Sequence, residues 1–185
     1  MKDYYRPILL WIFAFLIVSS ISTNAYCETA AVSLDQPGPI FKMEFRRHTC
    51  NVILMELTFS TAQISREEEV QLIGNGSYQA DTKELINPGI TVPLRIRVVK
   101  IESKLLGQAK EREIRSWECK TQGISSFSPG PERSVSRSAG SITLPRGKYR
   151  IEVSLLEPVT ALKDIPAYFG FGSSFKISPN REDCR

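Results

Sequence analysis

Hydrophobic and polar residues alternate along several short segments of this chain, which is typical of strands that bury one face. Phe41, Met43 and Phe45 alternate with charged neighbours, and residues 51–60 are apolar enough for a second strand. The further segments with strand character are 91–101, 111–119, 141–144, 148–156 and 168–177. About seven short strands without helical crossovers predict an all-β protein, an antiparallel β-sandwich.

One segment has a helical signal instead. Ser65 is a suitable N-cap, Glu68 stands three residues later, and acids occupy the expected first turn. We therefore expect one short helix that begins after Ser65. Glu67, Glu68 and Glu69 could also be taken for a calcium site, but they lack the alternating Asp/Asn ligands of a calcium loop.

Two connections complete the expected topology. Residues 141–144 and 148–156 flank Pro145-Arg146-Gly147, and this pattern predicts a hairpin. Residues 122–140 are rich in Ser, Pro and Gly and show no period, which predicts a long mobile loop.

The beginning of the chain has the pattern of a secretory signal peptide. A basic start with Lys2 and Arg6 precedes an apolar run over residues 8–18, and small polar residues follow. The run has 11 residues, whereas a membrane anchor, the alternative, needs roughly 18 or more. We expect cleavage after Ala25 and export to a bacterial periplasm or beyond. The expected domains are a signal peptide at 1–25, an N-terminal segment at 26–39, the sandwich at 40–178 and a polar tail at 179–185.

Four cysteines follow that cleavage point, namely Cys27, Cys50, Cys119 and Cys184. Structural zinc sites use closely spaced pairs of ligands, but the gaps here are 23, 69 and 65 residues. In an exported chain an even number of cysteines predicts two disulfides, for which three pairings exist. We favour Cys50–Cys119 in the core and Cys27–Cys184 between the termini.

The composition leaves little material for catalysis. The chain has 185 residues, 42% of them hydrophobic and 24% charged, and His48 is its single histidine. A Ser-His-Asp or Cys-His mechanism would have to use His48, which is expected in a turn. We therefore predict no catalytic residue, no cofactor and no metal site. A hydrolase based on two carboxylates stays open as an alternative.

Basic residues recur on the strand-like segments, and the chain has 24 Lys and Arg against 20 Asp and Glu. Side chains two apart on a strand share a face, so Arg95 and Arg97 project together, as Lys148 and Arg150 do. If these strands are neighbours, the outer face of one sheet is basic and could attract an acidic protein or an anionic glycan or lipid. The alternative is an ordinary solvated face on which Glu102, Glu113 and Glu152 compensate the charge. The candidate binding residues are Arg46, Arg47, Arg95, Arg97, Lys148, Arg150 and, as a loop aromatic, Phe127.

Several landmarks occur in the order and spacing of a known family. They are Leu72-Ile73-Gly74, Pro88-Gly89-Ile90, Pro93-Leu94, Ile96, Lys100, Ile142, Leu144, Gly147-Lys148-Tyr149-Arg150 and Val153. Over residues 41–177 the chain resembles a family of small exported bacterial β-sandwich proteins of unknown function. The resemblance implies an exported single-domain sandwich and supplies no catalytic residues.

These observations favour a protein that acts by binding. The most concrete hypothesis is an inhibitor or immunity-type protein that blocks an exported effector or toxin through a loop on a rigid scaffold. The alternative is an envelope module that binds glycan or anionic lipid through the basic face. Nucleic acid is not an expected partner, because no aromatic-basic motif is present.

Overall fold

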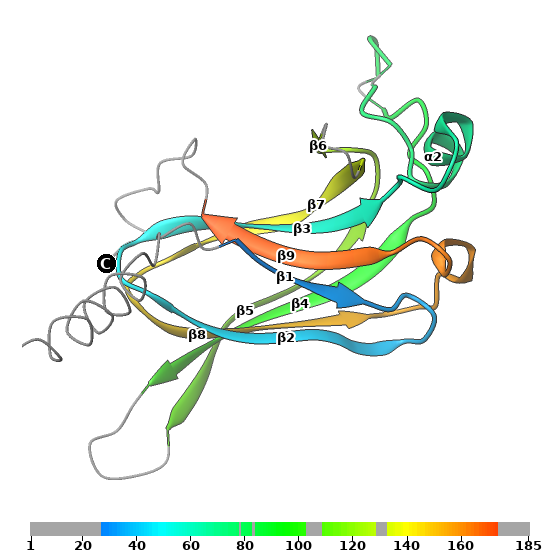
Figure 1. The fold of residues 1–185 in the computed structure, drawn as a ribbon. Helices are drawn as coiled ribbons and strands as arrows, with labels where there is room; N and C mark the ends of the chain where they lie inside the picture. The colour runs from blue at the N-terminus through cyan, green and yellow to red at the C-terminus, as the bar shows by residue number, and fades with distance from the viewer. Residues whose placement is uncertain (1–26, 78, 83, 103–108, 129–132, 174–185) are drawn as a thin grey trace, which may run out of the picture.

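A computed structural model of the chain describes residues 27–77, 79–82, 84–102, 109–128 and 133–173. These residues form two antiparallel sheets that pack face to face (Figure 1). The fold is therefore an all-β sandwich, as the alternation of apolar positions predicts. The expected signal peptide and the polar tail lie outside the described residues.

The larger sheet has the strand order β1-β9-β3-β7-β6. Its strands are β1 (Cys27–Val32), β3 (Asn51–Ser60), β6 (Ser126–Ser128), β7 (Ser134–Leu144) and β9 (Ala167–Ser173). β3 lies at its centre and pairs with both β7 and β9.

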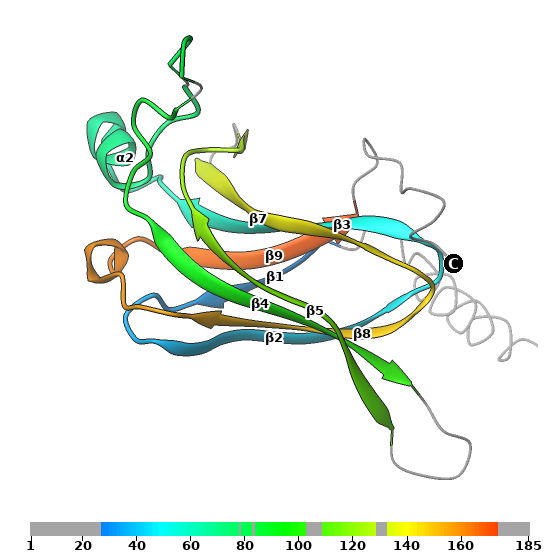
Figure 2. The ribbon, with the colours of Figure 1, turned by 180° about the vertical axis from the view of Figure 1, so that it is seen from behind.

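The smaller sheet has the order β2-β8-β4-β5. Its strands are β2 (Gly38–Arg47), β4 (Val92–Glu102), β5 (Lys110–Thr121) and β8 (Gly147–Leu155). β4 and β5 continue past the sandwich at one end, as the view from behind shows (Figure 2). The outer face of the smaller sheet is open to solvent, and its inner face packs on the larger sheet.

The core lies between the sheets and consists of the alternating apolar positions of both. In β4, Leu94, Ile96 and Val98 are fully buried, while Arg95 and Arg97 between them are exposed. Aromatic rings join the layers: the Phe41 and Phe169 centroids are 5.0 Å apart, and those of Phe45 and Phe171 are 4.6 Å apart. This period of two is the physical reason why the strands could be recognised locally.

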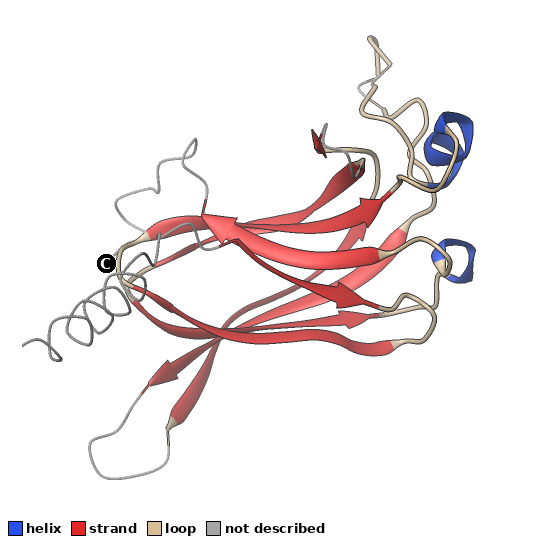
Figure 3. Cartoon of the chain, in the orientation of Figure 1, coloured by secondary structure: helices blue, strands red, loops and turns tan. Residues whose placement is uncertain are grey.

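Two short helices lie at one end of the sandwich (Figure 3). They are α2 (Arg66–Leu72) and the 3-10 helix η1 (Thr160–Leu162). The Ser65 side chain accepts from the Glu68 backbone, and the Glu68 carboxylate accepts from the Ser65 backbone at 2.9 Å. The expected capped helix is therefore present. Among the described residues, none of the helices combines the length and the hydropathy that crossing a bilayer requires.

Three local features of the fold differ from what the sequence indicates. The segment before residue 40 contains a strand, β1, which pairs with β9. Residues 122–140 are largely strand rather than a long loop, since they contain β6 and most of β7. Small Ser, Ala and Gly residues suppress the alternation there, because β7 offers few large side chains that reveal which face is buried.

The third correction concerns the hairpin predicted around Pro145. β7 pairs with β3 in the larger sheet, while β8 pairs with β2 and β4 in the smaller one. The turn therefore carries the chain from one sheet to the other. Local spacing cannot distinguish such a crossing from a hairpin, because both need a short turn between two strands.

Candidate binding site

The outer face of the smaller sheet carries the candidate arginines, and carboxylates on neighbouring strands neutralise them. Arg97 on β4 bonds to Glu113 on β5 at 2.6 Å and to Glu152 on β8 at 2.9 Å. Arg95 bonds to Glu118 at 2.6 Å. The cations in this network are Lys42, Arg95, Arg97, Lys148 and Arg150, and the carboxylates are Glu44, Glu111, Glu113, Glu118 and Glu152.

Arg150 is the centre of this network. Its guanidinium lies 2.6 Å from Glu111, 2.7 Å from Glu152 and 3.5 Å from Glu44. β8 is an inner strand of the sheet, so Arg150 meets acids from both sides, and its side chain is only 10% exposed. The two strands are neighbours, but their outer face is an ion-pair network with equal numbers of cations and carboxylates, which agrees with the alternative of a face whose charge glutamates compensate.

The pKa values on this face follow from the pairing. A hydrogen bond from Lys148 lowers the pKa of Glu44, and one from Arg150 lowers the pKa of Glu111. The pKa of Glu152 is also lowered, because its bonds to Arg97 and Arg150 together outweigh desolvation. A general acid requires the opposite shift, so none of these three carboxylates suits that role.

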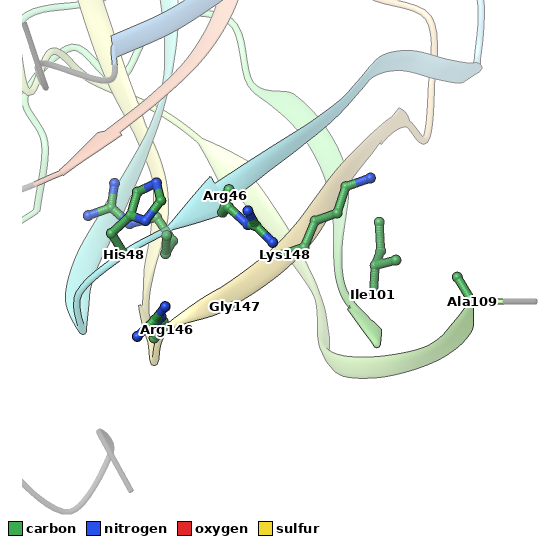
Figure 4. Close-up of a pocket in the computed structure, with 8 residues that line it drawn as sticks. Arg46, His48, Ile101, Ala109, Arg146, Gly147 and Lys148 are labelled. Carbon is green, nitrogen blue, oxygen red and sulfur yellow. The ribbon is translucent and has the colours of Figure 1, made fainter. Parts of the chain in front are cut away.

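Basic residues also gather at one end of the sandwich, which we call the basic end: Arg46, Arg47, His48, Arg146 and Lys148. They line a cavity of about 700 Å³ together with Ile101, Ala109 and Gly147. Figure 4 shows Arg46 and Lys148 side by side on neighbouring strands, with His48 and Arg146 on the adjoining turns.

The charge balance at the basic end differs from that of the sheet face. Lys148 reaches Glu44 at 2.6 Å, but neither Arg46 nor Arg146 forms an ion pair with a described carboxylate. Both arginines are exposed, whereas Arg47 points to the other side of β2 and is buried. Arg46 and Arg146 can therefore attract an anionic group, since no described carboxylate cancels their charge.

The candidate residues thus fall into three groups. Arg46, Arg47 and Lys148 come together at the basic end, whereas Arg95, Arg97 and Arg150 belong to the neutralised face, which Lys148 joins through its pair with Glu44. Phe127 lies on β6 opposite Val135, at the start of β7, far from the basic end, and its side chain is not described. Arg146 was missing from the candidates, although its place in a turn next to Lys148 could have indicated it.

The predicted Cys50–Cys119 disulfide is wrong, because Cys119 is a free thiol. Cys119 pairs with Leu94 on the smaller sheet, while Cys50 precedes β3 at the opposite end of the sandwich. Burial raises the pKa of Cys119 to about 11, so this thiol stays protonated at neutral pH. The predicted Cys27–Cys184 pair lies outside the described side chains.

His48 is exposed just after β2, in the turn where the sequence predicts it. Within the described ranges, no group of three or more His, Cys, Asp or Glu side chains is arranged to hold a metal ion.

A second cavity, of about 660 Å³, lies near the same end but opens on the inner side of the smaller sheet. We call it the β5–β7 cleft. Its lining residues are Lys100, Arg112, Ile114, Arg115, Ser141, Ile142, Thr143, Leu144, Pro145 and Tyr149. The Tyr149 hydroxyl donates to the Pro145 carbonyl at 2.9 Å, which holds the sheet-crossing turn against the floor of the cleft.

The fold and these cavities define a β-sandwich with two cationic concavities at one end. The model of the family described as Domain of unknown function (DUF5625) matches residues 30–173. The chain belongs to this family, in agreement with the resemblance to an uncharacterised family of sandwich proteins. No curated protein matches the chain.

A solved structure shares the fold. The crystal structure of GEBA250068378 from Sulfurospirillum deleyianum aligns with a TM-score of 0.63 at 16% identity, covering 81% of this chain and 98% of that one. A structure of infectious bursal disease virus, Gx strain, aligns with a TM-score of only 0.26 at 11% identity, covering 84% of this chain and 32% of that one. The first similarity extends to the fold alone, and the second carries no argument.

Proposed function

We propose that this protein is a non-enzymatic binding protein that acts after export and holds an acidic partner protein at its basic end. Its most concrete form is an inhibitor or immunity-type protein that blocks an exported effector. The partner's carboxylates would meet Arg46, Arg146 and Lys148.

The observation that carries this proposal is the contrast in charge compensation within one sheet. Arg95, Arg97 and Arg150 have carboxylates within 3 Å, whereas Arg46 and Arg146 have no ion-pair partner among the described carboxylates. Cations that a fold leaves uncompensated in a concavity are suited to an external anion, and such complementarity speeds association and selects partners.

The inhibitor hypothesis needs a different binding surface from the one that the sequence indicates. Residues 122–140, which we expected to form the binding loop, contain β6 and most of β7. The proposal therefore places the binding surface at the basic end instead of that loop. An envelope glycan or anionic lipid is the second candidate. It is favoured by the cavity itself, because a concave cluster of cations also accepts a single phosphate or carboxylate.

The test is affinity capture with immobilised protein and matched variants. Arg46→Gln with Arg146→Gln removes two charges from the basic end. Arg95→Gln with Lys120→Gln removes two charges elsewhere in the same sheet and serves as the control. We expect the wild type and the control to recover one dominant acidic protein from host and neighbouring-strain extracts at near-equal stoichiometry.

The basic-end variant should lose roughly tenfold or more of that affinity, and raised salt should weaken capture by the wild type. Capture that the basic-end variant retains in full would reject this site. Recovery of only glycan or lipid, with the same dependence on Arg46 and Arg146, would replace the inhibitor by the envelope module.

A further inference from the structure

The inner side of the β4–β5 extension carries cations because of a bulge in β5. The register shifts between Val98 and Val99, so that Val98 faces Arg115 and Lys100 faces Arg112, with Ile114 as the extra residue. In a regular strand, positions 112 and 115 would point to opposite faces. The bulge instead brings Arg112 and Arg115 to the same face as Lys100, toward the larger sheet.

These cations have little internal compensation. Arg112 lies 3.9 Å from Glu102, while Lys100 and Arg115 form no ion pair with a described carboxylate. The Arg115 guanidinium lies over the Trp117 ring, 5.4 Å from its centroid. A row of cations spaced along two strands therefore faces the cleft.

The opposite wall of the cleft is an incompletely paired strand. β7 pairs with β3 along one edge, but β6 covers its other edge only at residues 134–136. Farther along, the Trp117 indole donates to the Ala139 carbonyl at 3.2 Å. From Ser141 to Leu144, no described strand pairs with this second edge, which leaves backbone donors and acceptors for a further strand.

We propose that the β5–β7 cleft receives an extended acidic segment of the partner protein, which adds as a strand to the free edge of β7. This inference rests on the proposed function and names the way in which the partner is held. The backbone of the added segment bonds to β7, and its carboxylates bond to Lys100, Arg112 and Arg115.

Strand geometry specifies the ligand further. Side chains at alternate positions of a strand share a face and are about 7 Å apart. The cleft's cations belong to a sheet with the same repeat, so acids at every second position would meet them together. An acidic segment with this alternation is expected to bind better than one with the same acids in a block.

The probe is a synthetic peptide, acetyl-Thr-Glu-Val-Glu-Val-Glu-Thr-amide, titrated onto the purified protein by isothermal titration calorimetry. Its isomer, acetyl-Thr-Glu-Glu-Glu-Val-Val-Thr-amide, has the same composition without the alternation. A third peptide carries N-methyl groups on alternate backbone amides. The variants are Arg112→Gln with Arg115→Gln and, as the control, Arg95→Gln with Lys120→Gln.

We expect the alternating peptide to bind and the cleft variant to lose roughly tenfold in affinity, whereas the control variant binds as the wild type does. One of the two N-methyl registers should abolish binding, because it blocks the bonds to β7. Equal affinity for all peptides, unchanged affinity of the cleft variant, or no binding by any peptide would each overturn the cleft proposal. Partner capture that depends on Arg46 and Arg146 but not on Arg112 and Arg115 would overturn it too, while leaving the proposed function standing.

Discussion

Two arginines of the sandwich have different kinds of partner. The contrast separates an arginine that the fold requires from one whose substitution the fold should tolerate. Arg150 lies on the outer face of the smaller sheet among three carboxylates, next to solvent. Arg137 on β7 is fully buried at the other end of the molecule, and its guanidinium donates to backbone carbonyls instead. The carbonyls belong to Leu72, Ile73, Ile90 and Thr121.

The two sites differ in how easily other groups can replace a lost hydrogen bond. Around Arg150 several exposed side chains can rearrange, and water can replace a lost bond. The carbonyls around Arg137 come from α2, β5 and the segment between α2 and β4, so one side chain joins three parts of the chain. Burial lowers the pKa of Arg137 to about 10, which still leaves it charged at neutral pH. Substitutions can measure how far the two sites differ.

The largest effect is expected for Arg137→Met. It removes the shared donor and leaves buried carbonyls without a partner, so we expect a loss of about 3–5 kcal/mol in the free energy of unfolding. Urea denaturation followed by circular dichroism measures it, with Arg95→Met on the exposed face as the control. A loss below about 1 kcal/mol would show that water satisfies these carbonyls.

A second substitution tests the packing of the segment that Arg137 holds. Gly89 has a φ of +68°, and a Cβ there would collide with the backbone of Ile73. We expect Gly89→Ala to destabilise by about 2–4 kcal/mol, because strain and overlap add. Gly38 also has a positive φ, +129°, but nothing lies within 4 Å of its would-be Cβ. Gly38→Ala therefore isolates the backbone cost, and equal losses for both would refute the steric argument.

A smaller effect is expected at Glu69 on α2, whose carboxylate is buried between two partly exposed arginines. It pairs with Arg66, and its other oxygen lies 3.1 Å from Arg133. Glu69→Gln keeps the shape but removes the charge, so we expect a loss of about 1–2 kcal/mol. Glu67 in the same turn is exposed, and Glu67→Gln should change the midpoint of thermal unfolding far less. The hypothesis fails if the two variants melt together.

The smallest effects belong to the outer face. Arg95→Ala breaks one exposed ion pair, for which we expect a loss of less than about 1 kcal/mol in the free energy of unfolding.

The pH dependence of stability tests the contribution of these charges more directly. The pKa values of Glu44, Glu111 and Glu152 are lowered in the folded protein. Their contribution to stability is thus present above their ordinary value of 4.5 and is lost as the pH falls through the lower folded values.

Arg150→Met should therefore be less stable than the wild type at pH 7, and this difference should shrink as the pH falls below about 4.5. Thermal unfolding of both proteins from pH 7 to pH 3 measures it. A difference that stays constant with pH would mean that packing of the Arg150 side chain, rather than its charge, supplies the stability.

Much of the fold follows from local patterns, and the misses have a common cause. The alternation in β2, β4 and β8 and the capping box at Ser65 depend on residues close in sequence, so they could be recognised directly. β6 and most of β7 were not predicted as strands, because their small polar residues do not show which face is buried. Arg137 gave no signal, since a buried arginine among serines looks like an exposed one until the fold is known.

The candidate site shows the same division. The sequence places Arg95 and Arg97 on one face of a strand, and Lys148 and Arg150 on one face of another. Whether carboxylates neutralise these cations depends on the tertiary structure, because strand pairing brings Glu113, Glu118 and Glu152 next to the arginines. The cleft depends in addition on the bulge at Ile114, which turns Arg115 to the side of Arg112.

The sequence alone thus determined the class of fold, the capped helix and the residues that β2, β4 and β8 bury, because side-chain alternation and capping act over a few positions. Only the tertiary structure decided which charges cancel, which cysteine stays free and where the uncompensated cations gather. Those properties depend on distances between residues far apart in the chain, and pairing and register set these distances.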